Sequence, residues 1–125
     1  MNQIIHTDRA PAAIGPYSQA VKAGNMLFVS GQLPIDPATG AFPGEDITSQ
    51  TRQSLTNVQA ILEEAGYALS DVVKTTVLLA DIGDFAAMNA VYAEFFTANC
   101  PARAAFAVKD LPKGAKVEIE VVASK

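Results

Sequence analysis

The residue best suited to binding an anion is Arg103, which stands among small side chains in the segment Pro101-Ala-Arg-Ala-Ala-Phe-Ala-Val108. In an extended strand, Arg103, Ala105 and Ala107 point to one face, so methyl groups leave room beside the guanidinium. A guanidinium holds a carboxylate through two parallel charge-assisted hydrogen bonds. The segment therefore indicates a site for a small carboxylate. An arginine that reaches solvent or pairs with a structural acid is the alternative.

Two acidic side chains are placed to handle a proton. Glu118 and Glu120 alternate with apolar residues in the segment Lys116-Val-Glu-Ile-Glu-Val-Val122. In a strand, both carboxylates share the face opposite the apolar residues that face the core. Such carboxylates could position a water molecule or accept a proton. A solvated strand face is the simpler alternative, and the choice depends on whether Arg103 lies nearby.

Three further polar side chains could border a cleft. Asn89 falls on the apolar side of a predicted helix, where a buried amide must find a partner or cost about 1–3 kcal/mol. The partner of the Asn89 amide could be either the backbone or a ligand. Tyr17 and Ser30 lie at ends of predicted strands, beside Gly15 and Gly31. They could line a cleft there, and ordinary turn packing is the alternative.

The composition excludes several classes of protein. Of the 125 residues, 50% are hydrophobic and 18% are charged, which is too apolar for intrinsic disorder and long enough for one domain with a core. The net charge of −4 and the lack of a basic stripe disfavour nucleic-acid binding. The first residues do not resemble a signal peptide, and no apolar run reaches the roughly 18 residues of a membrane span. We expect a cytoplasmic protein without membrane contact.

Common cofactor and nucleophile motifs are absent. One cysteine and one histidine, Cys100 and His6, predict neither an internal disulfide nor a His/Cys metal centre within one chain. The sequence contains no Gly-x-Gly-x-x-Gly, Walker A, Cys-x-x-Cys or Gly-x-Ser-x-Gly motif. We therefore expect no metal, no cofactor and no covalent catalysis.

Hydrophobic periodicity predicts the elements that must position these residues. Strands are predicted over Tyr17–Lys22, Met26–Ser30, Val72–Ala80, Ala102–Val108 and Lys116–Ala123. Helices are predicted from Asp46 or Thr48 to Ala65 and from Asp84 to about Thr97. This order predicts an α+β fold with two helices on one face of a sheet. The apolar strand Val72–Ala80 is predicted to be buried on both faces, so we expect other subunits to cover the second face.

Four segments together closely resemble one family. They are Ala12-Ala-Ile-Gly-Pro-Tyr-Ser-Gln19, Phe28-Val-Ser-Gly-Gln32, Pro101-Ala-Arg103 and Val117-Glu-Ile-Glu120. The family is the Rid family, formerly YjgF, and the subgroup is RidA, the 2-iminobutanoate/2-iminopropanoate deaminases. The resemblance runs from Ala10 to Ala123, so a single Rid-family domain is expected over residues 1–125. It implies a chorismate-mutase-like sheet backed by two helices, and a homotrimer with its sites between adjacent subunits.

The resemblance also implies roles for individual residues. The family's carboxylate-binding arginine falls on Arg103, and its water-orienting glutamate falls on Glu118 rather than Glu120. The remaining substrate-binding positions fall on Tyr17, Ser30, Gly31, Asn89 and Ala105. Many RidA proteins have a cysteine in place of Ala105. The family's contact there uses the backbone, so activity is expected to survive in a changed pocket.

The function implied by the resemblance is hydrolysis of short 2-imino or enamine acids to 2-keto acids and ammonia. The partners are then the small imino acid and further copies of the chain. One alternative is a non-catalytic trimer that binds small carboxylate metabolites. Another is an endoribonuclease or translation inhibitor, since Rid proteins have also been described in these terms. The acidic composition disfavours this last alternative.

Overall fold

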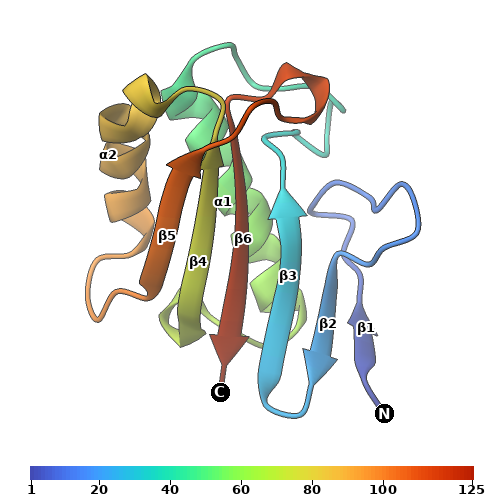
Figure 1. Ribbon diagram of the computed structural model, residues 1–125. Helices are drawn as coiled ribbons and strands as arrows, with labels where there is room; N and C mark the ends of the chain where they lie inside the picture. The colour runs from blue at the N-terminus through green and yellow to red at the C-terminus, as the bar shows by residue number, and fades with distance from the viewer.

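A computed structural model describes residues 1–125 as one six-stranded sheet with two helices packed on one face (Figure 1). The strands are β1 (Gln3–Ile5), β2 (Ala20–Ala23), β3 (Met26–Gln32), β4 (Val72–Leu79), β5 (Ala102–Ala107) and β6 (Val117–Ser124). The helices are α1 (Ile47–Glu64) and α2 (Phe85–Phe95). Short 3-10 turns span Leu69–Asp71, Ile82–Asp84 and Pro112–Gly114. The expected α+β class is confirmed.

The sheet has the strand order β1-β2-β3-β6-β4-β5. Every neighbouring pair is antiparallel except β4 and β5, which are parallel. The last strand of the chain, β6, thus lies between β3 and β4, as Figure 1 shows. Its central position brings Glu118 beside strands from both halves of the sequence.

The alternating pattern of β6 gives the sheet one buried face. Val117, Ile119 and Val121 are no more than 2% exposed and belong to the core beneath the helices. Leu55 and Ile61 of α1 are fully buried in the same core. Truncation of such a residue to alanine costs about 2–5 kcal/mol. Glu118 and Glu120 point to the opposite side, as their spacing predicts.

The ends of α1 agree with their sequence signals. The Asp46 carboxylate caps the helix by accepting hydrogen bonds from the Ser49 backbone N–H at 2.8 Å and from its Oγ at 2.7 Å. These bonds, the side-chain one first, lower the pKa of Asp46. Beyond the C-terminal end, Gly66 has a φ of +83°, a conformation that glycine adopts without strain.

The chain before β3 differs from the prediction. The first strand of the hairpin begins at Ala20 rather than at Tyr17. Gly15 has a φ of +128°, and the Tyr17 N–H donates to the Gly15 carbonyl at 2.9 Å, so these residues form a turn. The sequence analysis also missed β1, whose three residues are too few to show a periodic pattern.

Within one chain, β4 is buried on one face only, and cover of its second face by other subunits stays a prediction. Val77 and Leu79 are fully buried, but Val73 is 45% exposed beside an irregularity in the pairing with β6. The helices cover one face only, and no other layer covers the second face (Figure 1). We call this second face the open face; it carries Phe28 and Phe106, each 47% exposed. Neither helix is long and apolar enough to cross a membrane.

Candidate active site

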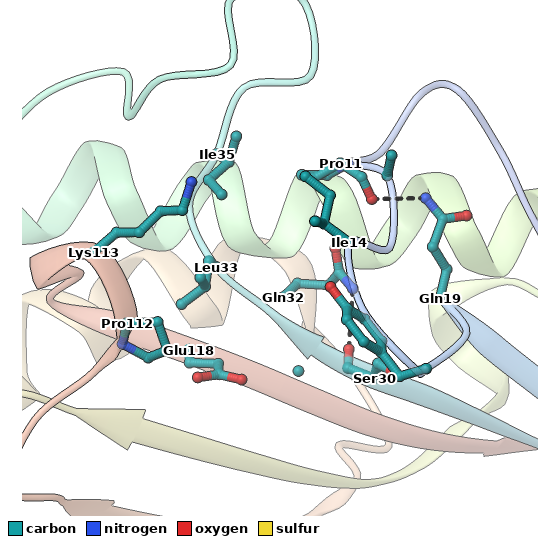
Figure 2. A pocket seen from close by; sticks show the side chains of 13 residues that line it. Pro11, Ile14, Gln19, Ser30, Gln32, Leu33, Ile35, Pro112, Lys113 and Glu118 are labelled. Atoms are coloured by element: carbon teal, nitrogen blue, oxygen red, sulfur yellow. Dashed lines mark hydrogen bonds between the residues drawn. The ribbon is translucent and has the colours of Figure 1, made fainter.

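A cavity of about 530 Å³ lies at the end of β3, beneath the loops that precede α1 and β6. Its lining includes Tyr17, Ser30, Gly31 and Glu118, four of the residues predicted for the site. Figure 2 shows Glu118 and Ser30 on neighbouring strands at one end of the cavity. Leu33, Ile35 and Lys113 lie on one side, and Pro11 and Ile14 lie on the other.

An irregularity in β3 shapes this end of the cavity. The register between β3 and β6 shifts between Val29 and Gln32, which includes Ser30 and Gly31. Such bulges bend a strand and redirect its side chains. Ser30 is fixed there because its Oγ donates to the Ser18 carbonyl at 2.6 Å and its backbone N–H donates to the Gln19 carbonyl at 2.9 Å.

Gly31 is required by the close approach of Glu118. A Cβ atom on Gly31 would overlap the Glu118 Oε2 and lie 2.9 Å from its carboxyl carbon. The absence of a side chain therefore lets the Glu118 carboxylate lie against the backbone of β3. This is the physical reason for a glycine at position 31.

Glu118 has the properties of a proton acceptor. Its side chain is half-buried and has neither a salt bridge nor a hydrogen bond to another protein group. Burial, and then the charge of Glu120, raises the pKa of Glu118 above the ordinary value of a glutamate. A carboxylate with a raised pKa holds a proton more readily at neutral pH, which suits general acid–base chemistry. Glu120 is exposed and does not line the cavity.

A second group of predicted residues lies beside α2. The Arg103 Nη1 donates to the Asn89 Oδ1 at 2.7 Å. The guanidinium carbon lies 4.7 Å from the centre of the Tyr92 ring and 5.4 Å from the centre of the Phe85 ring. Within the chain, Asn89 thus bonds a side chain and not the backbone, and a ligand as a further partner stays a prediction. It orients the arginine.

The groups that contact the Arg103 guanidinium are uncharged. No carboxylate forms a salt bridge with it. Tyr92 is itself fixed, because its hydroxyl shares a hydrogen bond of 2.8 Å with the buried Thr75 hydroxyl. Burial raises the pKa of Tyr92, so its ring remains neutral at ordinary pH. An oriented guanidinium without a counter-charge is a ready binding group for an anion.

The two groups lie on opposite faces of the sheet. Arg103 pairs with Thr75, which is buried on the helix side, and Ala105 points the same way. Glu118 pairs with Leu78, three residues further along β4 and on the open face. Within one chain, the cavity therefore contains Glu118 but not Arg103.

Sequence reasoning missed several residues near these groups, of which Phe85, Tyr92 and Lys113 carry charge or hold it. Phe85 and Tyr92 support Arg103, and their spacing with Asn89 along one side of a helix was the signal that could have revealed them. Lys113 lines the cavity from a left-handed backbone conformation with a φ of +60°. No local pattern predicts its position. No three histidine, cysteine or acidic side chains gather in a way that could hold a metal ion.

Comparison with known proteins identifies the class of this protein. A family model described as Endoribonuclease L-PSP matches residues 7–125. A RutC family protein of Pyrococcus horikoshii is 58% identical over 125 residues, covering 100% of this chain and 99% of that protein. A 2-iminobutanoate/2-iminopropanoate deaminase of Salmonella typhimurium is 53% identical over 126 residues, covering 98% of each.

Solved structures show the same fold. The YjgF gene product of E. coli aligns with a TM-score of 0.95 and 52% identity, over 98% of each chain. E. coli TdcF with bound serine aligns with a TM-score of 0.95 and 48% identity, also over 98% of each chain. The protein belongs to the Rid (YjgF) family.

Proposed function

We propose that this protein hydrolyses short 2-imino acids, such as 2-iminobutanoate and 2-iminopropanoate, to 2-keto acids and ammonia. The observation that carries the proposal is Glu118, an unpaired and half-buried carboxylate with a raised pKa in the wall of a small cavity. The deaminase name of the Salmonella relative, at 53% identity, supports the reaction. The serine in E. coli TdcF supports a ligand that carries a carboxylate beside a nitrogen-bearing carbon.

In the proposed reaction, Glu118 orients a water molecule and accepts its proton as the oxygen bonds to the carbon of the C=N group. The C=N electron pair moves to the nitrogen, which takes one proton back from Glu118 and one from the new hydroxyl group. The C–N bond then breaks, and ammonia leaves as the C=O bond forms. An imine carbon is already electrophilic, so orientation supplies much of the required help. Tyr17 and Ser30 border the reacting end of the cavity. Backbone groups near Gly31 and Ala105 are available to bond the substrate.

We further propose that Arg103 of a second copy binds the substrate carboxylate and completes the site. Arg103 and Glu118 each lack a charged partner within the chain, and they lie on opposite faces of the sheet. The open face exposes Phe28 and Phe106, so association of copies would remove apolar surface from water. A closed homotrimer would fit this arrangement. Each copy would place its Arg103 in the cavity of one neighbour, and its own cavity would receive the Arg103 of the other neighbour.

A trapping assay tests this function. A threonine dehydratase generates the imine, and semicarbazide traps whatever is not hydrolysed. The wild-type protein should reduce the trapped product, and a folded Arg103→Ala variant should not. Near-normal hydrolysis by Arg103→Ala would remove the arginine from the mechanism.

Two other functions predict different results for the wild-type and Arg103→Ala proteins. A non-catalytic carboxylate-binding protein would bind 2-ketobutyrate through Arg103 without speeding the loss of imine. The description of the family model, Endoribonuclease L-PSP, favours RNA cleavage as a third candidate. The net charge of −4 opposes it. RNA cleavage by pure protein, abolished by Arg103→Ala, would support it.

A further inference from the structure

One wall of the cavity is apolar and lacks support from the sheet. Leu33 and Ile35 line the cavity just beyond the end of β3 (Figure 2). Neither residue takes part in a backbone–backbone hydrogen bond, so the ladder between β3 and β6 does not fix their position. Another part of the molecule must hold this wall.

A single side chain supplies that support. Asn57 of α1 is fully buried, and its Nδ2 donates to the Leu33 carbonyl at 3.1 Å and to the Ile35 carbonyl at 2.9 Å. Its Oδ1 accepts a hydrogen bond from the Gln53 Nε2 at 2.9 Å, which orients the amide so that both N–H groups face the wall. A buried, fully bonded amide of this kind holds a loop in one position.

Loss of these bonds would release the wall. Two carbonyl groups without partners are costly to keep buried, so they would turn toward water and move the loop. The apolar side chains of Leu33 and Ile35 would then withdraw from the cavity. Glu118 and Ser30 would keep their places, because they lie on β6 and β3 and have separate support.

We propose that Asn57 is a positioning residue that sets the selectivity of the site for the length of the substrate side chain. The inference rests on the proposed function. With the carboxylate bound by Arg103 and the imine carbon beside Glu118, the remaining part of the substrate extends into the cavity. A short side chain ends before the apolar wall, whereas a longer one packs against it. Imino acids with unbranched apolar side chains longer than that of 2-iminobutanoate therefore gain a contact with this wall that the short ones lack.

The test compares imines of different length. An amino-acid oxidase with catalase generates them from 2-aminobutyrate and from norleucine, and semicarbazide measures their hydrolysis. Asn57→Asp keeps the shape of the side chain but cannot donate to both carbonyls. We expect its KM for the longer imine to rise about tenfold, with kcat and the KM for the shorter imine little changed. If Asn57→Asp fails to fold, Asn57→Ser replaces it, because a hydroxyl can donate to only one carbonyl.

Two companion variants make the result specific. Leu33→Ala shortens the wall itself and should raise the KM for the longer imine in the same way. Thr56→Ala removes an exposed hydroxyl beside Asn57 on α1, whose only hydrogen bond is to the Arg52 carbonyl, so its selectivity should match the wild type. An unchanged ratio of KM values in a folded Asn57 variant would overturn the proposal. An equal change in Thr56→Ala would also overturn it, since any disturbance of α1 would then suffice.

A binding measurement separates this inference from the proposed reaction. Calorimetry with 2-oxobutanoate and 2-oxohexanoate reports the affinity for products without any catalytic step. Asn57→Asp should weaken only the binding of the longer acid. If Asn57→Asp weakens only the binding of the longer acid but the wild type hydrolyses no imine, the proposed reaction fails and the role of Asn57 stands. If the wild type hydrolyses imines but Asn57→Asp binds both acids normally, the role of Asn57 fails alone.

Discussion

Glu118 and Glu120 are alike in sequence but differ in environment. Both lie on β6 and point to the open face, yet only Glu118 is half-buried and lines the cavity. Gly31 makes this possible by leaving space for the carboxylate. A residue's neighbours on the next strand, rather than its own type, thus decide which of two acids can act as a base.

The pH dependence of hydrolysis should distinguish the two acids. Glu118 accepts a proton only when ionised, so kcat/KM should fall as the pH falls through its raised pKa. Glu120→Gln removes one cause of that raised pKa and should move this fall to lower pH while activity remains. Glu118→Gln should reduce kcat by about 10²–10⁴-fold at every pH. Equal losses in both variants would show that Glu118 is not the specific base.

Arg103 illustrates a charge kept available by neutral neighbours. Asn89 accepts one of its hydrogen bonds, and the rings of Tyr92 and Phe85 lie close to the guanidinium. Such contacts orient a cation without neutralising it. An acidic partner in their place would compete with an incoming carboxylate.

Substitutions at Tyr92 should therefore affect binding more than turnover. Tyr92→Leu removes the ring and should raise KM about three- to tenfold. Tyr92→Phe keeps the ring, loses only the bond to Thr75, and should change KM less. Phe96→Leu is the matched control, because Phe96 stacks on Tyr92 but no contact joins it to Arg103. A larger KM change in Phe96→Leu than in Tyr92→Leu would contradict this role.

At the scale of elements, regular patterns were predictable and local irregularities were not. The alternation of β6 and a helix that begins near Asp46 follow from local chemistry, and the structure confirms both. The three residues of β1 owe their conformation to pairing with β2, a long-range contact that no short pattern reveals. The register shift at Ser30 and Gly31 is likewise a property of two strands. The candidate site depends on that shift, so the four segments that resemble the Rid family indicated its residues better than periodicity did.

Gly31→Ala tests the close approach of β3 and β6. The added methyl group would overlap the Glu118 carboxylate and force it away from the backbone. We expect a loss of about 1–3 kcal/mol in the free energy of unfolding, measured by urea titration. Hydrolysis should fall further than this instability explains, because the base moves. Glu118→Ala supplies the matched background, because without the carboxylate the methyl group added at Gly31 should cost much less stability. Normal hydrolysis by Gly31→Ala would show that the position of Glu118 is not critical.

At the scale of the whole molecule, the proposed site is divided between two faces. Tyr17, Ser30, Gly31 and Glu118 line one cavity, whereas Asn89, Arg103 and Ala105 gather near α2. The sequence contains both groups but no information about which face each one occupies until the sheet register is known. That register is the main thing the structure adds to the sequence analysis.

Mixing two inactive variants tests whether copies share the site. Arg103→Ala and Glu118→Gln should each be inactive alone. When the two are unfolded together and refolded as an equal mixture, about a quarter of the contacts between copies should pair an intact Arg103 with an intact Glu118. Activity near that fraction of wild type is expected in the trapping assay, with light scattering to measure the assembly. No recovery in a mixed assembly would place both residues in one chain's site or in none.

The position of β6 has a consequence for synthesis of the protein. Within the sheet, β1–β3 and β4–β5 are joined only through this strand, which is synthesised after the other five. A nascent chain that has reached residue 110 lacks β6, so the facing edges of β3 and β4 have no partner. Such edges invite pairing with other chains. The sheet is therefore complete only once β6 has been made.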